Sequence, residues 1–270
     1  MPSVSTSTTT SGSAARTGSP DGPSMGQIAA QFDVRNISSR QLGELSRMLH
    51  QAGVTGRLGS VDDGSSVLDY TAIEKERQHS VDPALAYLEH EGKTINFVDA
   101  PGYPDFVGGA ICSMCGMDTV VLVISATAGI EVNTRRLYKL ASEANLPGAI
   151  VVNRIDGDNV QFDRLMADIA ETFGSACKAL NLPTGGATGV IDCFVNDSGE
   201  ADFGDVAEAH TELVENIIEA DEEMMEAYLG GEDIPADRLS NAFATAMVEG
   251  TVIPVAFTAA ASEVGVKEFM

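Results

Sequence analysis

Two short polar segments carry residue types suited to phosphate chemistry, and the first is the turn from Asp99 to Gly102. It follows the apolar residues 95–98, which we predict to form a short buried strand. A carboxylate at the end of such a strand can hold the water shell of a Mg²⁺ ion, and a glycine just beyond it lets a backbone N–H approach a terminal phosphate. A D-x-x-G tetrapeptide alone is weak evidence, because ordinary strand-to-helix turns have the same composition.

The second segment is Asn153-Arg154-Ile155-Asp156, which follows another apolar run at 148–152. A carboxylate accepts hydrogen bonds from the ring N–H and the exocyclic amine of guanine, and an asparagine amide suits the acceptor edge of the same base. Two polar segments, each at the end of a predicted buried strand, therefore predict a guanine-nucleotide site more strongly than either segment alone.

The elements that must position these segments alternate along the chain. Apolar runs predict strands at 118–125, 148–152 and 252–257, and we predict a short first strand at 32–37. Helical periodicity predicts helices at 38–52, 105–117, 131–145 and 160–173. Continuous apolar strands that alternate with amphipathic helices predict an α/β fold with a mainly parallel sheet and helices on both faces. Ligands of such sheets bind at the carboxyl ends of the strands, where both segments lie.

The region before the acidic turn is less regular. Residues 54–80 lack a clear period, which predicts a long mobile loop of the kind that often carries function. Residues 81–90 and 95–98 predict a hairpin joined through Glu91-Gly92.

The composition of the chain changes at about residue 175. Residues 179–237 contain no Lys or Arg and become dense in carboxylates. An apolar stripe nevertheless predicts one acidic amphipathic helix at 208–229, followed by a second helix that stops at Gly250. We therefore predict a sheet domain formed by 31–174 and 250–270, with 175–249 as an inserted acidic α+β subdomain.

Composition also limits the function classes. The chain has 270 residues, 16 of them Lys or Arg and 40 Asp or Glu, which gives a net charge of -24. Such a polyanion is repelled by bulk nucleic acid, so we expect no DNA partner. Four scattered cysteines do not suit a disulfide framework and favour a reducing, cytoplasmic location. Cys112 and Cys115 form a C-x-x-C pair, which we predict to be two core-facing thiols on one helix face.

The first residues of the chain have little to bury. Residues 1–24 are mostly Ser, Thr, Gly and Pro, and we predict a disordered tail over 1–30. This tail contains no apolar run long enough for a secretory signal, and no later segment reaches the length of a membrane span. We therefore expect no membrane partner.

Several segments together resemble the GTP-binding domain of translation elongation factor G, nearest to divergent bacterial elongation factor G-like paralogues. They are VDAPGYPDF, NRID and FTAAASEVGV for the nucleotide site, and LPTGGATGVIDCF and LVENIIEADEEMMEAYLGGEDI for the inserted subdomain. The similarity runs from about Phe32 to the C-terminus. It implies a P-loop GTPase-like fold, GTP or GDP and Mg²⁺ as cofactors, and GTPase activity. It also implies the ribosome and its acidic stalk protein as partners in protein synthesis.

The resemblance also implies a role for each matching residue. The implied guanine-binding residues are Asn153, Arg154, Asp156, Thr258 and Ala259. The implied phosphate-binding residues are Asp99 and Gly102. The implied Mg²⁺ ligands are Ser80 and Asp99, and the residue at the position of the family's catalytic histidine is Tyr103.

The sequence departs from the family pattern in three places. Tyr103 replaces the histidine and is a poor water-orienting group near neutral pH. Arg154 replaces a lysine, which keeps the charge and changes its geometry. The family's phosphate loop, expected between Ile37 and Ser38, is missing, because the sequence contains no G-x-x-x-x-G-K-[ST] motif. The only Gly-Lys-Thr, at 92–94, precedes a predicted strand and not a helix.

Two hypotheses follow from this combination. In the first, the chain is a translation elongation factor G-like GTP-binding protein that acts with the ribosome. In the second, it is a non-hydrolysing interaction module or truncated paralogue that keeps the fold without tight nucleotide binding. The guanine and magnesium segments favour the first hypothesis, and the absent phosphate loop and Tyr103 favour the second.

Overall fold

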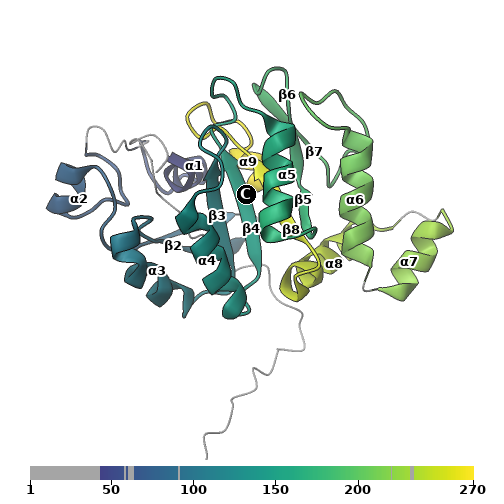
Figure 1. Cartoon of the computed structure of the whole chain (residues 1–270), viewed down its shortest axis with the longest axis horizontal. Helices are drawn as coiled ribbons and strands as arrows, with labels where there is room; N and C mark the ends of the chain where they lie inside the picture. The colour runs from purple at the N-terminus through teal and green to yellow at the C-terminus, as the bar shows by residue number, and fades with distance from the viewer. Residues whose placement is uncertain (1–42, 58, 60–63, 91, 220, 232–233) are drawn as a thin grey trace, which may run out of the picture.

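A computed structural model describes residues 43–57, 59, 64–90, 92–219, 221–231 and 234–270 (Figure 1). The tail predicted for 1–30 and the strand predicted for 32–37 lie outside these residues. The helices are α1 (Gly43–Gln51), α2 (Ala72–Arg77), the 3₁₀ turn η1 (Pro104–Phe106), α3 (Val107–Met114), α4 (Val132–Glu143), α5 (Phe162–Phe173), α6 (Val206–Ile218), α7 (Glu222–Leu229), α8 (Ala236–Glu249) and α9 (Val266–Phe269). Within the described segments, no helix combines the length and apolar character needed to cross a bilayer.

The described strands form one parallel sheet and two hairpins. The parallel sheet has the order β3 (Val120–Ser125), β4 (Gly148–Asn153), β8 (Ile253–Phe257) and β5 (Cys177–Ala179). The antiparallel pairs are β1 (Ala84–His90) with β2 (Lys93–Asp99), and β6 (Asn181–Thr184) with β7 (Gly189–Asp192). The predicted α/β fold is confirmed, and so is the hairpin that leads into the acidic turn.

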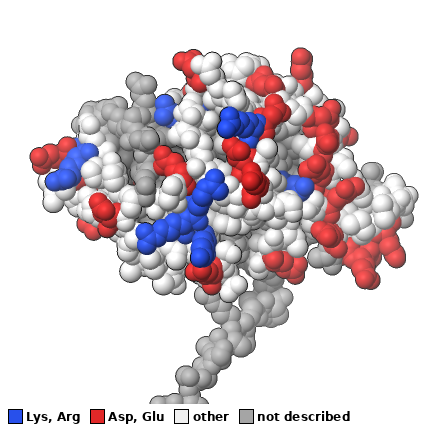
Figure 2. Space-filling model, in the orientation of Figure 1, with Lys and Arg blue, Asp and Glu red and all other residues white. Residues whose placement is uncertain are grey.

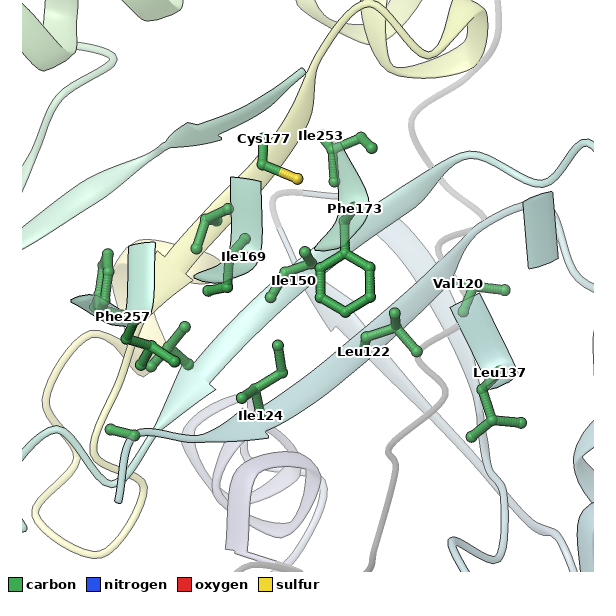
Figure 3. Packing of buried hydrophobic residues seen from close by; sticks show 14 of the residues in the cluster. Val120, Leu122, Ile124, Leu137, Ile150, Ile169, Phe173, Cys177, Ile253 and Phe257 are labelled. Atoms are coloured by element: carbon green, nitrogen blue, oxygen red, sulfur yellow. The ribbon is translucent and has the colours of Figure 1, made fainter. Parts of the chain in front are cut away.

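Both faces of the parallel sheet are buried, because alternate residues of each strand point to opposite sides. On one face Val120, Leu122 and Ile124 of β3 pack with residues of α4 and α5, and Figure 3 shows Phe173 among Leu122, Ile150 and Ile253. The other face carries Val121 and Val123 of β3, which cluster with these residues of α1, β1 and β2: Leu45, Met48, Leu49, Leu88 and Phe97.

The region before the hairpin is more ordered than expected. Residues 72–77, predicted as part of a mobile loop, form α2. Thr71 and Glu74 make a capping box, in which the Thr71 hydroxyl accepts from the Glu74 N–H and the Glu74 carboxylate accepts from the Thr71 N–H. Glu74 is fully buried, and its other oxygen accepts from the backbone N–H groups of Val81 and Asp82 at 3.0 and 3.1 Å. One carboxylate therefore ties α2 to the chain that enters β1.

The acidic region has its own apolar cluster. Leu213, Ile217 and Ile218 of α6 pack with Met224 of α7 and Ala246 of α8. The single helix predicted for 208–229 is wrong, because Asp221 caps a new helix by accepting from the Met224 N–H at 2.9 Å. The division into a sheet domain and an inserted subdomain stays a prediction. Since β5 pairs with β8, residues 177–179 belong to the parallel sheet and not to such an insertion.

The surface charge is unevenly distributed. Figure 2 shows Asp and Glu crowded over α6 and α7, while a basic group lies over α4, which carries Arg135, Arg136 and Lys139. The acidic face is partly neutralised, because Arg238 of α8 lies 3.6 Å from Asp221 and 3.3 Å from Glu223.

Candidate nucleotide site

The guanine segment begins at the carboxyl edge of the parallel sheet. Asn153 is the last residue of β4 and lies in register with Ser125, the last residue of β3. The neighbouring strand β8 ends at Phe257, so the loop that follows it starts at the same edge. The topology therefore brings Asn153, Asp156 and the 258–264 loop together, as the sequence pattern predicted for the strand ends.

Asn153 is held rigidly but keeps one donor unused. Its Oδ1 atom accepts from the Arg154 N–H at 2.6 Å and from the Ala260 N–H at 3.2 Å. Its Nδ2 atom is buried and has no hydrogen-bond partner among the described residues. A buried amide donor without a partner costs free energy, about 1–3 kcal/mol, unless a ligand accepts from it. The acceptor edge of guanine is such a ligand.

The cavity beside Asn153 has a volume of about 480 Å³. It falls within the range of about 300–1,000 Å³ that is usual for small-ligand pockets. Its lining residues are Thr127, Asn153, Arg154, Asp156, Gly157, Asp158 and Ala261. The Asp156 carboxylate accepts from the Ser262 hydroxyl at 3.1 Å through Oδ2, and this contact orients the carboxylate at the cavity edge. The carboxylate and the Asn153 amide together offer the acceptors and the donor that guanine requires.

Arg154 occupies an unusual backbone conformation, with φ at +65°. Few residues other than glycine adopt a positive φ, and the bond from the Arg154 N–H to Asn153 Oδ1 holds this conformation in place. Arg154 is one of the residues that line the cavity.

The loop after β8 presents a different residue to the cavity from those the resemblance implies. Thr258 and Ala259, which the resemblance implies as guanine-binding residues, are fully buried. The Ala259 N–H donates to the Val264 carbonyl of the same loop at 2.9 Å. The residue of this loop that lines the cavity is Ala261. The loop closes at Gly265, where φ is +73° and an added Cβ would lie 2.3 Å from the Phe257 carbonyl oxygen. Only glycine fits there.

A distant arginine fixes this loop, and the sequence patterns did not reveal it. The Nη2 atom of Arg47 on α1 donates to the Ala261 carbonyl at 3.0 Å, and its Nη1 atom pairs with Glu263. Arg47 is 214 residues from Ala261 in the chain. The ion pair is partly shielded, since the Arg47 side chain is 17% exposed. Arg47 therefore holds the loop that contributes Ala261 to the cavity.

The acidic turn lies in a different environment. Asp99 ends β2 and is buried, and neither of its carboxyl oxygens has a hydrogen-bond partner among the described residues. Burial, reinforced by the nearby charges of Asp69 and Glu74, raises the pKa of Asp99 to about 8. Near neutral pH this carboxyl therefore carries a proton.

Ser80 and Asp69 form a hydrogen bond with each other and none with Asp99 among the described contacts. The Ser80 hydroxyl donates to Asp69 Oδ1 at 3.1 Å, so the predicted metal ligand is committed to a buried carboxyl. Burial raises the pKa of Asp69. For Glu74 burial also acts to raise the pKa, but hydrogen bonds from Val81, Thr71 and Asp82 outweigh it and the pKa is lowered.

These residues do not fit a Mg²⁺ site as they stand. Among the described residues, no group of three His, Cys, Asp or Glu side chains is arranged to hold a metal ion. The pKa of Asp99 is raised by burial without a cation nearby, and the charge of a bound cation would favour the ionised carboxylate. Asn153, Asp156 and the 258–264 loop thus lie together, whereas the Ser80 hydroxyl is bonded to Asp69 and the Asp99 carboxyl is buried without a partner among the described residues.

The two remaining predicted residues are Gly102, which ends the acidic turn, and Tyr103, which follows it. The Gly102 carbonyl accepts from Asn133 Nδ2 of α4 at 2.8 Å, which links the turn to that helix. Tyr103 is 41% exposed, and its ring centroid lies 4.6 Å from that of His79. The Nδ1 atom of His79 lies 2.9 Å from the Arg77 carbonyl. This histidine is the imidazole that the structure places beside Tyr103, and the sequence patterns did not single it out.

The comparisons with known proteins agree with this geometry. The family model described as "Elongation factor Tu GTP binding domain" matches residues 45–270. The chain belongs to this family of GTP-binding domains. The match covers most of α1, both polar segments and the loop after β8, so it includes the residues that line the cavity.

Individual relatives in this family are similar over most of the chain. An elongation factor G-like protein of Mycobacterium tuberculosis is 31% identical over 239 residues, which is 84% of this chain and 34% of the relative. One of Thermotoga maritima is 28% identical over 233 residues, 82% of this chain and 33% of the relative. A crystal structure of a Thermus thermophilus protein has a TM-score of 0.78 and 29% identity, covering 90% of this chain and 39% of that one. The chain thus spans about a third of the length of these curated relatives.

Proposed function

We propose that this chain is the guanine-binding part of an elongation factor G-like protein that acts with the ribosome in translation. The observation that carries the proposal is the buried Nδ2 atom of Asn153, which has no partner among the described residues and belongs to a residue that lines the same cavity as Asp156. Guanine has the acceptor edge and the two adjacent donors that these groups require. Arg47 and Ser262 hold the loop and the carboxylate that would contact the base.

The phosphate side supports binding less well. The sequence lacks the glycine-rich loop that would bind the phosphates. The acidic turn instead brings together the carboxyl groups of Asp99, Asp69 and Glu74, which cannot neutralise the negative charge of a triphosphate. Tyr103 is poorly suited to orient the attacking water. We therefore infer weak binding of GTP or GDP and no appreciable hydrolysis by this chain alone. The same observations support the second candidate, a non-hydrolysing interaction module.

Asp156→Asn should move the base preference from guanine to xanthine. Xanthine carries a carbonyl where guanine has its exocyclic amine, so the amide donor introduced by the substitution can pair with it. Loss of a charged hydrogen-bond partner costs about 1.5–3 kcal/mol, which corresponds to roughly 10–100-fold weaker guanine binding. Competitive titration against a fluorescent guanine nucleotide measures both affinities.

Asp158→Asn is the matched control for this change. Asp158 lines the same cavity and is exposed, and its replacement makes the same change in net charge. It should leave the ratio of guanine to xanthine affinity unchanged. Equal loss of guanine affinity in the two variants would mean that charge alone, and not base recognition, controls binding.

The proposed contact with the ribosome involves the acidic face of α7. Glu222 and Glu226 are exposed one helical turn apart, and the described residues give neither an ion pair. Glu222→Lys with Glu226→Lys should weaken binding to a basic surface of the ribosomal stalk about tenfold at low salt, and added salt should shrink the difference. Asp163→Lys with Glu171→Lys makes the same charge change on α5 and should have little effect. Indistinguishable stalk affinities for the two double variants would contradict a role of α7.

A further inference from the structure

Cys112 and Cys115 lie on the outer face of α3, contrary to the core-facing arrangement predicted from the sequence. Both are exposed, together with Gly108 and Ile111, whereas Ala110 and Met114 are the buried residues of this helix. Positions 108, 111, 112 and 115 form one stripe of an α-helix. The helix therefore turns its small and apolar residues Ala110 and Met114 inward and presents both thiols to solvent.

The spacing of the two cysteines suits a direct sulfur–sulfur bond. Residues three apart in an α-helix have Cα atoms about 5 Å apart, which is inside the range of about 4.4–6.8 Å seen in disulfides. The Cys115 thiol points back along the helix, since its Sγ atom donates to the Ile111 carbonyl at 3.4 Å. Ile111 precedes Cys112 directly, so the thiol already leans toward the turn that carries its neighbour.

The end of α3 can accommodate the adjustment that such a bond needs. The helix ends at Met114, Cys115 is its C-cap, and the exposed Gly116 follows. Terminal helical residues lack part of the hydrogen-bond ladder and move at a lower cost than interior ones. A disulfide formed there remains exposed to reductants, which favours a labile, reversible bond over a structural one.

The other two cysteines are buried, and the pKa of each thiol is raised. Cys177 and Cys193 are buried, in β5 and next to β7. Burial raises the pKa of the Cys177 thiol to about 11, and burial together with Asp192 raises the pKa of Cys193 to about 12. Since the thiolate is the reactive form, oxidants should reach and consume the exposed pair first.

We propose that Cys112 and Cys115 form a reversible redox pair that closes into an intrahelical disulfide when a peroxide supplies the oxidant. The thiolate of one cysteine attacks a peroxide oxygen, the O–O bond breaks, and a sulfenic acid and water form. The second thiolate then attacks the sulfenic sulfur, the S–S bond forms, and a second water leaves. Two thiols lose two electrons and two protons, and one hydrogen peroxide is reduced to two water molecules.

The test uses the full chain, reduced and then exposed to hydrogen peroxide under native conditions. Free thiols are counted by alkylation, and the intact mass and the peptide carrying both cysteines are measured. The expected result is the loss of two of the four thiols, a monomer lighter by two hydrogen atoms, and full recovery with a dithiol reductant. Cys112→Ser and Cys115→Ser should each abolish this product, because each leaves one thiol without its resolving partner.

Three outcomes would overturn the proposal. The first is a mass gain of oxygen atoms in the unmodified chain without the loss of hydrogens. The second is a covalent dimer as the main product. The third is consumption of Cys177 and Cys193 at the same rate as the exposed pair. A Ser113→Ala variant keeps both thiols and changes only a residue between them, and its oxidation should match that of the unmodified chain.

Discussion

Asp99→Asn is expected to stabilise the fold by roughly 1–3 kcal/mol at pH 7, which is about 4 kcal/mol from removing the ionisable carboxyl less about 1–3 kcal/mol for burying an amide donor without a partner. The pKa of the Asp99 carboxyl rises from 3.8 to about 8 on folding, and the cost of holding its proton grows by about 1.4 kcal/mol for each pH unit above 3.8. The buried carboxyl has no partner for its oxygens and faces the charges of Asp69 and Glu74. An amide of the same shape carries no charge to desolvate.

The sign of this effect depends on pH. The folded state holds the Asp99 proton up to about pH 8, whereas the unfolded state releases it near the ordinary pKa of 3.8. Between these values the folded state binds more protons, so its stability falls as pH rises. The unmodified chain should therefore lose stability from pH 4 to pH 8 more steeply than the Asp99→Asn variant. Near pH 4 the stability advantage of the variant should disappear.

Urea unfolding at several pH values measures this difference. Asp105→Asn serves as the control, because Asp105 is exposed in the neighbouring turn and its replacement should shift stability little at any pH. A constant gap between the unmodified chain and the Asp99→Asn variant from pH 4 to pH 8 would contradict a protonated Asp99.

That Asn153, Asp156 and the loop after β8 lie together was predictable, because the information is local. Asn153 and Asp156 follow an apolar strand directly, and a parallel sheet places the ends of such strands at one edge. Arg47 was not predictable in this way, because its contacts with Ala261 and Glu263 come from a helix far away in the sequence. Nothing in the α1 sequence distinguishes Arg47 from an ordinary exposed helical arginine.

The start of α2 and the break between α6 and α7 were not predicted, although each has a helix-capping residue in the sequence. In both cases a stronger sequence pattern favoured another interpretation. Thr71 and Glu74 have the spacing of a capping box, but the polar residues after them favoured a loop. Asp221 has the residue type of an N-cap, but the continuous apolar stripe favoured one helix. For α3, C-x-x-C suggested a buried pair because free cysteines are usually buried. The inward positions were instead taken by Ala110 and Met114.

Inserting a phosphate-loop segment, G-x-x-x-x-G-K-T, between Ile37 and Ser38 is expected to give the largest gain in nucleotide affinity. Three or four charge-assisted hydrogen bonds to phosphate contribute roughly 1.5–3 kcal/mol each, or about 5–10 kcal/mol together, which corresponds to at least roughly a thousandfold tighter binding of GDP. The gain in affinity should depend on the new lysine, because its ammonium group would bind the phosphates directly. The chain as a whole has a net charge of -24 and otherwise repels an anionic ligand.

Turnover of GTP should rise far less than affinity in the same variant. Tyr103 remains at the position where the family has a histidine, and a phenol near neutral pH neither accepts nor donates a proton readily. A matched insertion with Ala in place of the lysine separates the effect of the lysine charge on affinity from the effect of the added loop. Adding Tyr103→His to the intact insertion tests whether the residue at 103 limits the orientation of the attacking water. Fluorescent-nucleotide titration and single-turnover hydrolysis measure the two quantities. Tight, magnesium-dependent binding by the unmodified chain would instead show that another segment already supplies the phosphate contacts.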